Sequence, residues 1–185
     1  REGKEFMPQT GKLENAIQFN YYMGMDLINI KYRDGRKNFK LYKGAEKIFY
    51  NINSVVGYDW CVIVEGEMDV LAFHEAGIKN VVSVPNGATL NHNNLDYLDN
   101  CIDYFTDKEK IILAVDQDDA GAALQQELIR RLGAEVCYLV NFVDCKDANE
   151  YLLKYGTKDL ANVINDCRPV PLENVTTFKD IEHEV

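Results

Sequence analysis

Short apolar runs alternate with stretches of helical spacing over the second half of the chain. The apolar runs are CVIV (61–64), VVSV (81–84), IILAV (111–115) and VCYLV (136–140). The helical stretches are VLAFHEAG (70–77), a segment that ends near residue 105, AALQQELIRRLG (122–133), EYLLKYG (150–156) and TKDLANVINDC (157–167). Apolar runs this short are typical of strands buried on both faces. Strands that alternate with helices form βα units, so we predict an α/β fold in which helices cover both faces of a parallel sheet.

The first part of the chain has a less regular pattern. The segment DLINIKYRDGRKNFKLYK alternates in places, and Asp34 and Gly35 have the composition of a hairpin turn between two strands. We predict a small basic α+β subdomain over residues 1–58, followed by the parallel-sheet domain over residues 59–167.

The two ends of the sequence suggest a piece of a longer protein. The chain begins at Arg1 rather than at a methionine. Residues 168–185 carry two prolines and many charges without a helical stripe. We therefore expect this last segment to be a linker towards a further domain.

The formal net charge of −10 hides two halves of opposite sign. Residues 1–58 contain 10 Lys/Arg and 6 Asp/Glu, a balance of +4, whereas residues 59–185 contain 10 and 24, a balance of −14. The bases of the first half gather in one stretch and are interleaved with aromatic residues. They are Lys31, Arg33, Arg36, Lys37, Lys40, Lys43 and Lys47, with Tyr32, Phe39 and Tyr42 between them. This pattern suits a surface for single-stranded nucleic acid or a triphosphate, and the plainer alternative is a solvated hairpin face.

Several classes of protein do not fit the composition. No run approaches 18 consecutive apolar residues, and the first residues lack the apolar core of a secretory leader, so we expect neither a membrane span nor a signal peptide. The 5 cysteines form no CxxC pair, which argues against a disulfide framework and a zinc ribbon. No P-loop motif occurs. We expect reduced thiols, a cytoplasmic location (a bacterial cytoplasm or a phage-infected host) and a monomeric fragment.

Acidic residues follow three of the predicted strands. Glu65 and Asp69 come after the first strand, Asp116 and Asp118 after the third, and Asp147 after the fourth. Because sites in parallel sheets gather at the carboxyl ends of the strands, these loops are expected to face one crevice. Like charges so close together would raise one another's pKa and oppose folding unless a cation lay between them. Oxygen ligands of this kind suit Mg²⁺, for which we expect Mn²⁺ to substitute.

Some of these acids also have a plainer interpretation. An aspartate at a helix start is often an N-cap, and Asp118 taken alone fits that role. We expect Asp69 to cap the first helix of the parallel-sheet domain. Glu65 stands between an apolar strand and Gly66, where a partly desolvated carboxylate could accept or donate a proton. Glu67 is expected at the surface.

The run VIVEGEMDVLAFHEAG (62–77) followed by AVDQDDAG (114–121) resembles the two signature motifs of the TOPRIM domain, which primases, topoisomerases and some nucleases share. The turn PNGA, the downstream KDANEYLLKYG and the upstream LINIKYRDGRKNFKLYKGAEK make the likeness closer. Together they resemble the primase half of phage-type primase-helicases, which are related to the Twinkle helicase and, more distantly, to DnaG-type primases. The likeness covers about residues 20–165.

The resemblance implies a role for each acid. Glu65 matches a glutamate proposed to act in acid/base chemistry, and Asp116 and Asp118 match a metal-binding pair. Asp69 matches the acid that completes the first motif, and Asp147 matches an acid implicated in metal binding in bacterial primases. The implied catalytic set is Glu65, Asp116 and Asp118. The implied ligand set for Mg²⁺ adds Asp69 and Asp147 to these three.

The resemblance also assigns the basic stretch to the lobe that handles template and incoming nucleotide. The residues expected to pair with phosphates are Lys31, Arg33, Arg36, Lys37 and Lys40, and those expected to stack a base are Tyr32 and Phe39. In the last acidic loop, Asn149 stands where bacterial primases have a second acid.

Three functions follow as hypotheses. The first is a DNA primase core that synthesises short RNA primers on single-stranded DNA by metal-dependent nucleotidyl transfer during DNA replication, with NTPs as substrates and a helicase domain covalently linked in the full-length protein. The second is a metal-dependent nuclease on the same scaffold. The third is a non-catalytic module that docks DNA for a replicative helicase.

Overall fold

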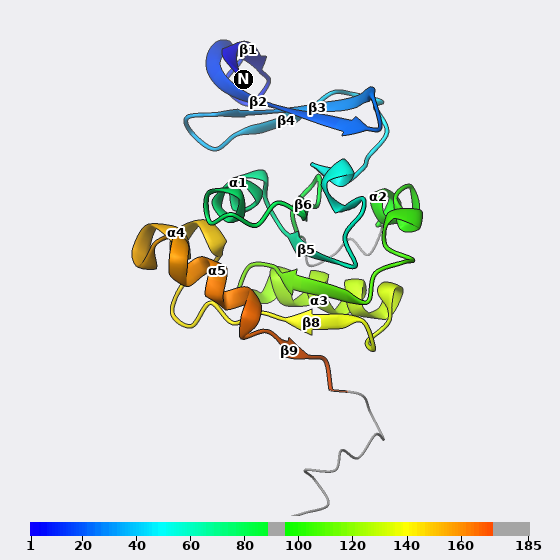
Figure 1. Ribbon diagram of the computed structural model, residues 1–185. Coiled ribbons are helices and arrows are strands. Elements are labelled where there is room, and N and C mark those ends of the chain that lie inside the picture. The colour runs from blue at the N-terminus through cyan, green and yellow to red at the C-terminus, as the bar shows by residue number, and fades with distance from the viewer. Residues whose placement is uncertain (89–94, 172–185) are drawn as a thin grey trace, which may run out of the picture.

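The computed structural model describes residues 1–88 and 95–171 and contains two sheets (Figure 1). The antiparallel sheet at the N-terminus consists, in spatial order, of β1 (Glu2–Met7), β2 (Lys12–Met23), β3 (Asp26–Asp34) and β4 (Phe39–Leu41). The second sheet consists, in spatial order, of β6 (Val81–Ser83), β5 (Trp60–Val64), β7 (Lys110–Ala114), β8 (Cys137–Leu139) and β9 (Arg168–Pro169). Its first four strands pair in parallel, and β9 pairs antiparallel with β8. The predicted α/β fold is confirmed.

Helices cover both faces of the parallel sheet, as predicted. They are α1 (Glu67–Glu75), α2 (Asp96–Asp99), α3 (Asp119–Leu132), α4 (Ala148–Tyr155) and α5 (Thr157–Asn165), with the 3-10 turns η1 (Ile52–Val55) and η2 (Ile102–Tyr104). Successive residues of a strand point to opposite faces. Helices α1, α4 and α5 pack on the face of Val62 and Ile112, whereas α2 and α3 pack on the face of Ile63 and Leu113.

The central strands explain why the apolar runs predicted the sheet well. In both β5 and β7 every residue after the first is buried. Helices α1, α3 and α4 begin two or three residues earlier than predicted, at Glu67, Asp119 and Ala148. Their first turns therefore contain part of the loops that carry the acids, which brings those acids close to the sheet.

The N-terminal sheet packs directly on the parallel-sheet domain. Phe19 and Tyr21 of β2 belong to the same buried cluster as Ile63 of β5, and the rings of both contact Tyr50 edge-on. Among the described residues before position 59, the only helical element is η1, so the expected α+β subdomain is almost entirely a sheet. Its contact with the rest of the molecule fixes the position of β3 and β4 relative to α1.

The C-terminal part of the described chain extends the sheet. Arg168 and Pro169 pair with Leu139 and Tyr138, although they lie in the segment predicted as a linker. The remainder of that segment, from residue 172, lies outside the described residues.

The five cysteines are placed as free thiols, and of these only Cys167 is not fully buried. Over the described ranges, we find no helix with the length and apolar character needed to cross a membrane.

Candidate active site

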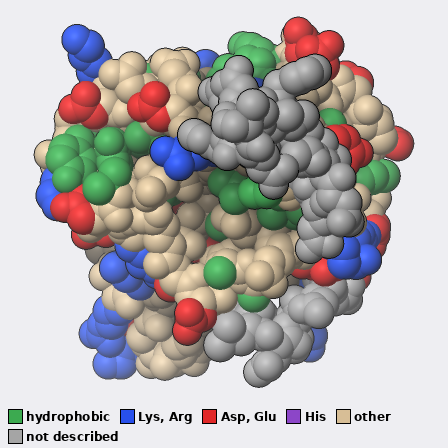
Figure 2. Space-filling view, turned by 90° about the horizontal axis from the view of Figure 1, so that it is seen from below, with side chains coloured by type: hydrophobic (Ala, Val, Ile, Leu, Met, Phe, Trp, Pro, Cys, Tyr) green, Lys and Arg blue, Asp and Glu red, His purple; other side chains and the backbone are tan. Residues whose placement is uncertain are grey.

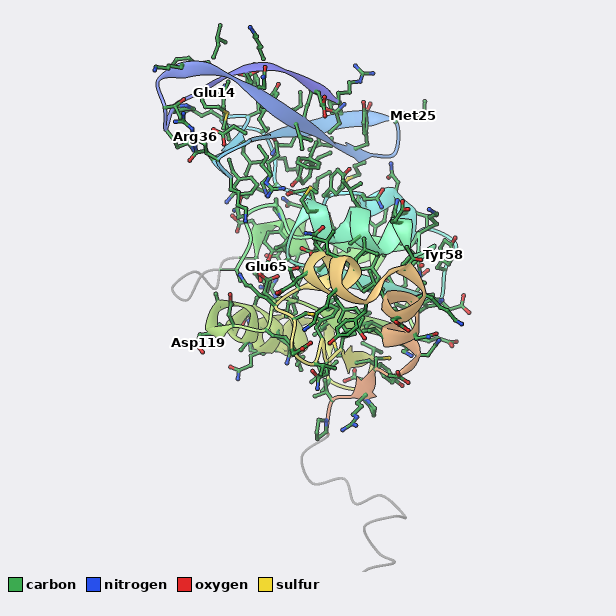
Figure 3. All side chains as sticks on the ribbon, turned by 90° about the vertical axis from the view of Figure 1, so that its left-hand side faces the viewer. Glu14, Met25, Arg36, Tyr58, Glu65 and Asp119 are labelled. Atoms are coloured by element: carbon green, nitrogen blue, oxygen red, sulfur yellow. The ribbon has the colours of Figure 1, made fainter. Side chains whose placement is uncertain are left out.

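The loops that follow β5, β7 and β8 meet at the carboxyl edge of the parallel sheet and form one wall of a cleft. The cleft has a volume of about 500 Å³, and β3, β4 and the turn between them form the opposite wall. Figure 3 shows Glu65 between the N-terminal sheet and α3, whose first residue is labelled. The ionisable lining residues of the first wall include Glu65, Asp69, Asp116, Lys146 and Asp147, and those of the second wall are Lys31, Arg33 and Lys37. Segments far apart in sequence therefore place opposite charges across one cleft.

Glu65 follows β5 directly and is held by the loop after β6. Its Oε1 accepts a hydrogen bond of 2.9 Å from the backbone N–H of Ala88. Its Oε2 is buried and has no hydrogen-bond partner among the described residues. Burial, and then the charges of Asp116 and Asp118, raise the pKa of Glu65, while the Ala88 amide lowers it. A buried carboxylate with one unpaired oxygen and a raised pKa is suited to proton transfer.

Asp116 and Asp118 leave β7 together and converge on one cation. The Lys146 ammonium lies 3.0 Å from Oδ2 of Asp116 and 3.1 Å from Oδ2 of Asp118. Burial raises the pKa of Asp116 although Lys146 lowers it. The pKa of Asp118 is lowered, first by the hydrogen bond from the Gly121 amide and then by Lys146. The two carboxylates in turn raise the pKa of Lys146.

Asp118 is also the N-cap of α3, so both interpretations of this residue have a structural counterpart. Its Oδ1 accepts a hydrogen bond of 2.9 Å from the N–H of Gly121. A Cβ at position 121 would lie 2.0 Å from the carbonyl oxygen of Asp116, a distance that no real contact allows. Glycine is therefore required here for α3 to approach the strand end so closely.

Asp69 and Asp147 form a second pair beside the first. Asp69 is buried in the first turn of α1, and its Oδ1 accepts a hydrogen bond of 3.1 Å from the N–H of Asn149. Burial, followed by the charge of Asp147, raises the pKa of Asp69 to about 7. Asp147 is the N-cap of α4 and accepts a hydrogen bond of 2.7 Å from the N–H of Glu150.

The expectation that Asp69 caps the first helix is wrong. The N-cap residue of α1 is Gly66, which has an extended backbone, and no side chain caps this helix. Because α1 begins at Glu67, Asp69 is already a helical residue whose side chain points towards the loop after β8. The carboxylate of Asp69 therefore lines the cleft instead of capping the helix.

The expectation that Glu67 lies at the surface is also wrong. Its Oε1 lies 2.7 Å from the ammonium of Lys31, with 3% and 8% of the two side chains exposed, and the hydroxyl of Tyr21 donates a second hydrogen bond to it. Strand alternation directs Lys31 from β3 towards α1, where it meets Glu67. Lys31 lines the cleft, but its charge is already paired within the protein.

The other predicted template-binding residues are divided between the two faces of the N-terminal sheet. Arg33, Lys37 and Phe39 line the cleft, and the guanidinium of Arg33 lies 5.8 Å from the centre of the Phe39 ring. Tyr32 and Lys40 are cross-strand partners and belong to the opposite face.

Lys40 and Arg36 do not line the cleft. The ammonium of Lys40 pairs with Glu5 at 2.6 Å. Arg36 is exposed in the turn after β3, and Figure 3 shows it at the edge of the N-terminal sheet. The structure thus brings only Lys31, Arg33, Lys37 and Phe39 of the predicted set to the cleft.

Comparison with known proteins agrees with this geometry. Residues 62–152 match a family model described as Toprim-like. The primase homolog protein of Arabidopsis thaliana is 37% identical over 178 residues, which cover 87% of this chain and 53% of that protein. The chain carries a primase-type TOPRIM domain.

Two further relatives extend the likeness beyond the TOPRIM domain itself. The chloroplastic/mitochondrial Twinkle homolog protein of Arabidopsis thaliana is 34% identical over 189 residues, which cover 93% of this chain and 27% of that protein. The crystal structure of the primase fragment of the bacteriophage T7 primase-helicase protein is 25% identical with a TM-score of 0.71, covering 88% of this chain and 66% of that one. The chain thus spans only 27% and 53% of the length of its two Arabidopsis relatives.

The carboxylate oxygens on the acidic wall of the TOPRIM domain are suitable ligands for a divalent metal ion. Within the described part of the chain, no three His, Cys, Asp or Glu side chains are placed to hold one metal ion together. Asp116 and Asp118 nevertheless direct one oxygen each to a single cation, and Glu65 keeps a buried oxygen without a partner. Hard carboxylate oxygens of this kind are the ligands that Mg²⁺ and Mn²⁺ prefer.

Sequence reasoning missed Lys146, although the sequence contains a signal for it. Lys146 directly precedes Asp147 in the run KDAN, so the same loop that supplies an acid also supplies a base. Its backbone is fixed by two contacts: the carbonyl accepts a hydrogen bond from the N–H of Gln117, and the N–H donates to Glu150. The first contact joins the loops after β7 and β8, which brings Lys146 to Asp116.

Proposed function

We propose that this chain is the catalytic core of a DNA primase that joins ribonucleotides on a single-stranded DNA template. The observation that carries the proposal is the cleft, because its acidic wall belongs to the TOPRIM domain and its basic wall belongs to β3 and the following turn. Such a pair of walls suits a reaction in which a charged strand and a triphosphate meet beside a divalent ion. On the face seen in Figure 2, by contrast, visible acidic and basic side chains are interspersed.

The proposed metal ligands are Asp116 and Asp118, with Asp69, Asp147 and Glu65 beside them. The TOPRIM and primase families generally bind divalent metal ions. When bound, Mg²⁺ would neutralise the triphosphate and lower the pKa of the attacking hydroxyl, and Mn²⁺ would substitute for it. In this arrangement Glu65 accepts or donates a proton at that hydroxyl. Its pKa is raised above that of an ordinary glutamate, so Glu65 binds a proton more readily than an exposed glutamate does.

The proposed contacts to template and nucleotide come from the basic wall. Arg33 and Lys37 pair with phosphates, and the half-exposed ring of Phe39 stacks on a base. Lys31 also lines this wall, and its pair with Glu67 connects the wall to α1. Tyr32, Lys40 and Arg36 lie away from the cleft and are proposed to contact only strand segments outside it.

The proposed partners are single-stranded DNA, NTPs and a helicase domain in the same polypeptide. This proposal is supported by the T7 primase domains of two gp4 subunits bound to an RNA/DNA hybrid and dTTP, which are 26% identical with a TM-score of 0.73. The Twinkle homolog and the T7 primase-helicase also support it. We propose the cytoplasm of a bacterium or of a phage-infected host as the location, in line with the 31% identical DNA primase of Aquifex aeolicus. The isolated fragment is proposed to be a monomer.

The test combines labelled single-stranded DNA, labelled NTPs and Mg²⁺ or Mn²⁺. We expect short RNA products with the unsubstituted protein and none with a variant that carries both Asp116→Asn and Asp118→Asn. Shortened DNA in place of RNA products would show the nuclease instead.

A non-catalytic DNA-docking module is the second candidate, because two observations favour it. Asp118 and Asp147 serve as helix N-caps, and the ammonium of Lys146 pairs with both Asp116 and Asp118. Titration of Mn²⁺ decides between the candidates independently of primer synthesis. Equal Mn²⁺ affinity of the unsubstituted protein and the double variant would leave only the docking role.

A further inference from the structure

The ammonium of Lys146 lies where two carboxylates converge. It is 3.0 Å from Asp116 and 3.1 Å from Asp118, and it comes from a different loop, the one after β8. Two fixed carboxylates that each offer one oxygen to a common point form the start of a divalent-cation site. The position is thus filled by a positive charge that belongs to the protein itself.

The acids are the fixed part of this arrangement and the lysine is the movable part. Asp118 is held by the Gly121 amide, and the backbone of Asp116 packs tightly against Gly121. The side chain of Lys146 is 53% exposed, whereas that of Asp116 is 13% exposed. The ammonium group of a flexible, half-exposed lysine side chain forms a weak ion pair, so another cation can readily replace it.

The displaced ammonium would remain in the cleft. Lys146 lines it, and among the described lining residues it is the only Lys or Arg on the TOPRIM wall. Across the cleft, Lys31 is already paired with Glu67, which leaves Arg33 and Lys37 as the other cations facing the same space. A ligand with several negative charges would therefore meet Lys146 on one side and these two residues on the other.

We propose that Lys146 and the divalent ion share one cation position. The ammonium neutralises Asp116 and Asp118 in the metal-free protein, the metal displaces it on binding, and the released ammonium pairs with a phosphate of the incoming nucleoside triphosphate. This inference rests on the proposed function, because it concerns the same metal and the same substrate. It assigns Lys146 two successive partners in one cleft.

Direct Mn²⁺ titration followed by electron paramagnetic resonance tests the first step. In Lys146→Met the competing charge is absent, so we expect Mn²⁺ to bind about three- to tenfold more tightly, in keeping with the loss of two partly exposed ion pairs. The metal-free variant should melt at a lower temperature, since the two acids then repel each other, and Mn²⁺ should raise its Tm more than that of the unsubstituted protein. Lys146→Arg keeps the charge and should not tighten Mn²⁺ binding.

A matched control distinguishes direct competition between Lys146 and Mn²⁺ for one position from the general electrostatic effect of a positive charge in the cleft. Lys37 lines the opposite wall, forms no ion pair with another described residue, and has a φ of 64°, which asparagine tolerates. Lys37→Asn therefore removes one charge from the cleft without touching the acids, and Mn²⁺ affinity should change by less than about twofold, since exposed charges at a distance are screened. Equal tightening in Lys37→Asn and Lys146→Met would overturn the proposal.

The remaining outcomes are also decisive. Unchanged Mn²⁺ affinity in Lys146→Met would refute the shared position, while loss of binding in Asp116→Asn would still uphold the metal site of the proposed function. No Mn²⁺ binding by the unsubstituted protein would refute the proposed function itself.

Calorimetry with ATP at saturating Mn²⁺ tests the second step, the contact between Lys146 and a phosphate. We expect ATP to bind about fivefold more weakly to Lys146→Met than to the unsubstituted protein, as for one lost charge-assisted contact. Equal ATP affinity would refute the phosphate contact.

Discussion

The buried ion pair between Lys31 and Glu67 is expected to connect the N-terminal sheet to the TOPRIM domain energetically. The pair joins β3 to α1 over 2.7 Å, with 8% and 3% of the side chains exposed. In Lys31→Met the glutamate keeps only the hydrogen bond from Tyr21. Removing one partner of a buried pair costs about 3–5 kcal/mol, because the other charge stays buried without compensation. We expect a loss of this size in the free energy of unfolding of Lys31→Met.

The double variant Lys31→Met, Glu67→Gln distinguishes a lost pair from lost packing. With both charges removed and the volumes nearly kept, its stability should lie within about 1 kcal/mol of that of the unsubstituted protein, because no uncompensated charge remains. Together with the single variant Glu67→Gln, these variants complete a double-mutant cycle, for which we expect a coupling energy of at least about 2 kcal/mol, because most of the loss in Lys31→Met disappears in the double variant.

Urea unfolding followed by tryptophan fluorescence measures these differences, because the chain has one tryptophan, Trp60, at the start of β5. The control is Lys40→Met, which breaks a pair of similar length, 2.6 Å, whose side chains are each 27% exposed. That variant should lose at most about 1 kcal/mol. A loss in Lys31→Met as small as in Lys40→Met, or losses that simply add in the double variant, would refute the assignment of this pair as a buried connection.

Three further predictions concern the cleft and the core. Gly121→Ala should lower the free energy of unfolding by about 1–3 kcal/mol and weaken Mn²⁺ binding, because the new Cβ would overlap the carbonyl of Asp116; urea unfolding and Mn²⁺ titration measure both effects. Asp118→Ala should cost about 0.5–2 kcal/mol through the lost N-cap, whereas Asp118→Asn should keep that stability and lose Mn²⁺ affinity. Native-state titration with Ellman's reagent at pH 8 should modify Cys167 first, because burial raises the pKa of Cys61 to about 12 and shields its thiol.

Controls for these predictions are present in the chain. Gly3→Ala places a Cβ in open space and should leave both stability and Mn²⁺ binding nearly unchanged, so a similar effect at both glycines would contradict the steric argument. Equal losses of stability in Asp118→Ala and Asp118→Asn would contradict the capping argument. Modification of all thiols at one rate without denaturant would contradict the burial of Cys61, Cys101, Cys137 and Cys145.

Local patterns were sufficient to predict the sheet and the convergence of the acids. Apolar runs identified β5 and β7, and the rule that parallel strands end at one edge was sufficient to predict that Glu65 and Asp116 lie in one cleft. The pair of Lys31 and Glu67 could not be predicted in this way, because it depends on how one sheet docks on another, and no periodicity in the sequence records that contact.

The role of Lys146 was missed for a different reason. A lysine beside an acid is ordinary in sequence, and its meaning arises only when the loop after β8 bonds to the loop after β7. The N-cap role of Asp118, in contrast, was recognisable from its place before a helix. The cap of α3 was therefore predictable from the local sequence, although that of α1 was not, whereas the contact between the loops after β7 and β8 depends on the tertiary structure.

The antiparallel strand β9 determines in which direction the described chain leaves the sheet. Arg168 lies opposite Leu139 and Pro169 opposite Tyr138, so the backbone runs back along β8 towards its amino end. The cleft opens at the other end of these strands. At Pro169 the described chain is therefore directed away from the cleft, so that β9 does not obstruct the approach of the proposed DNA template to the acidic wall.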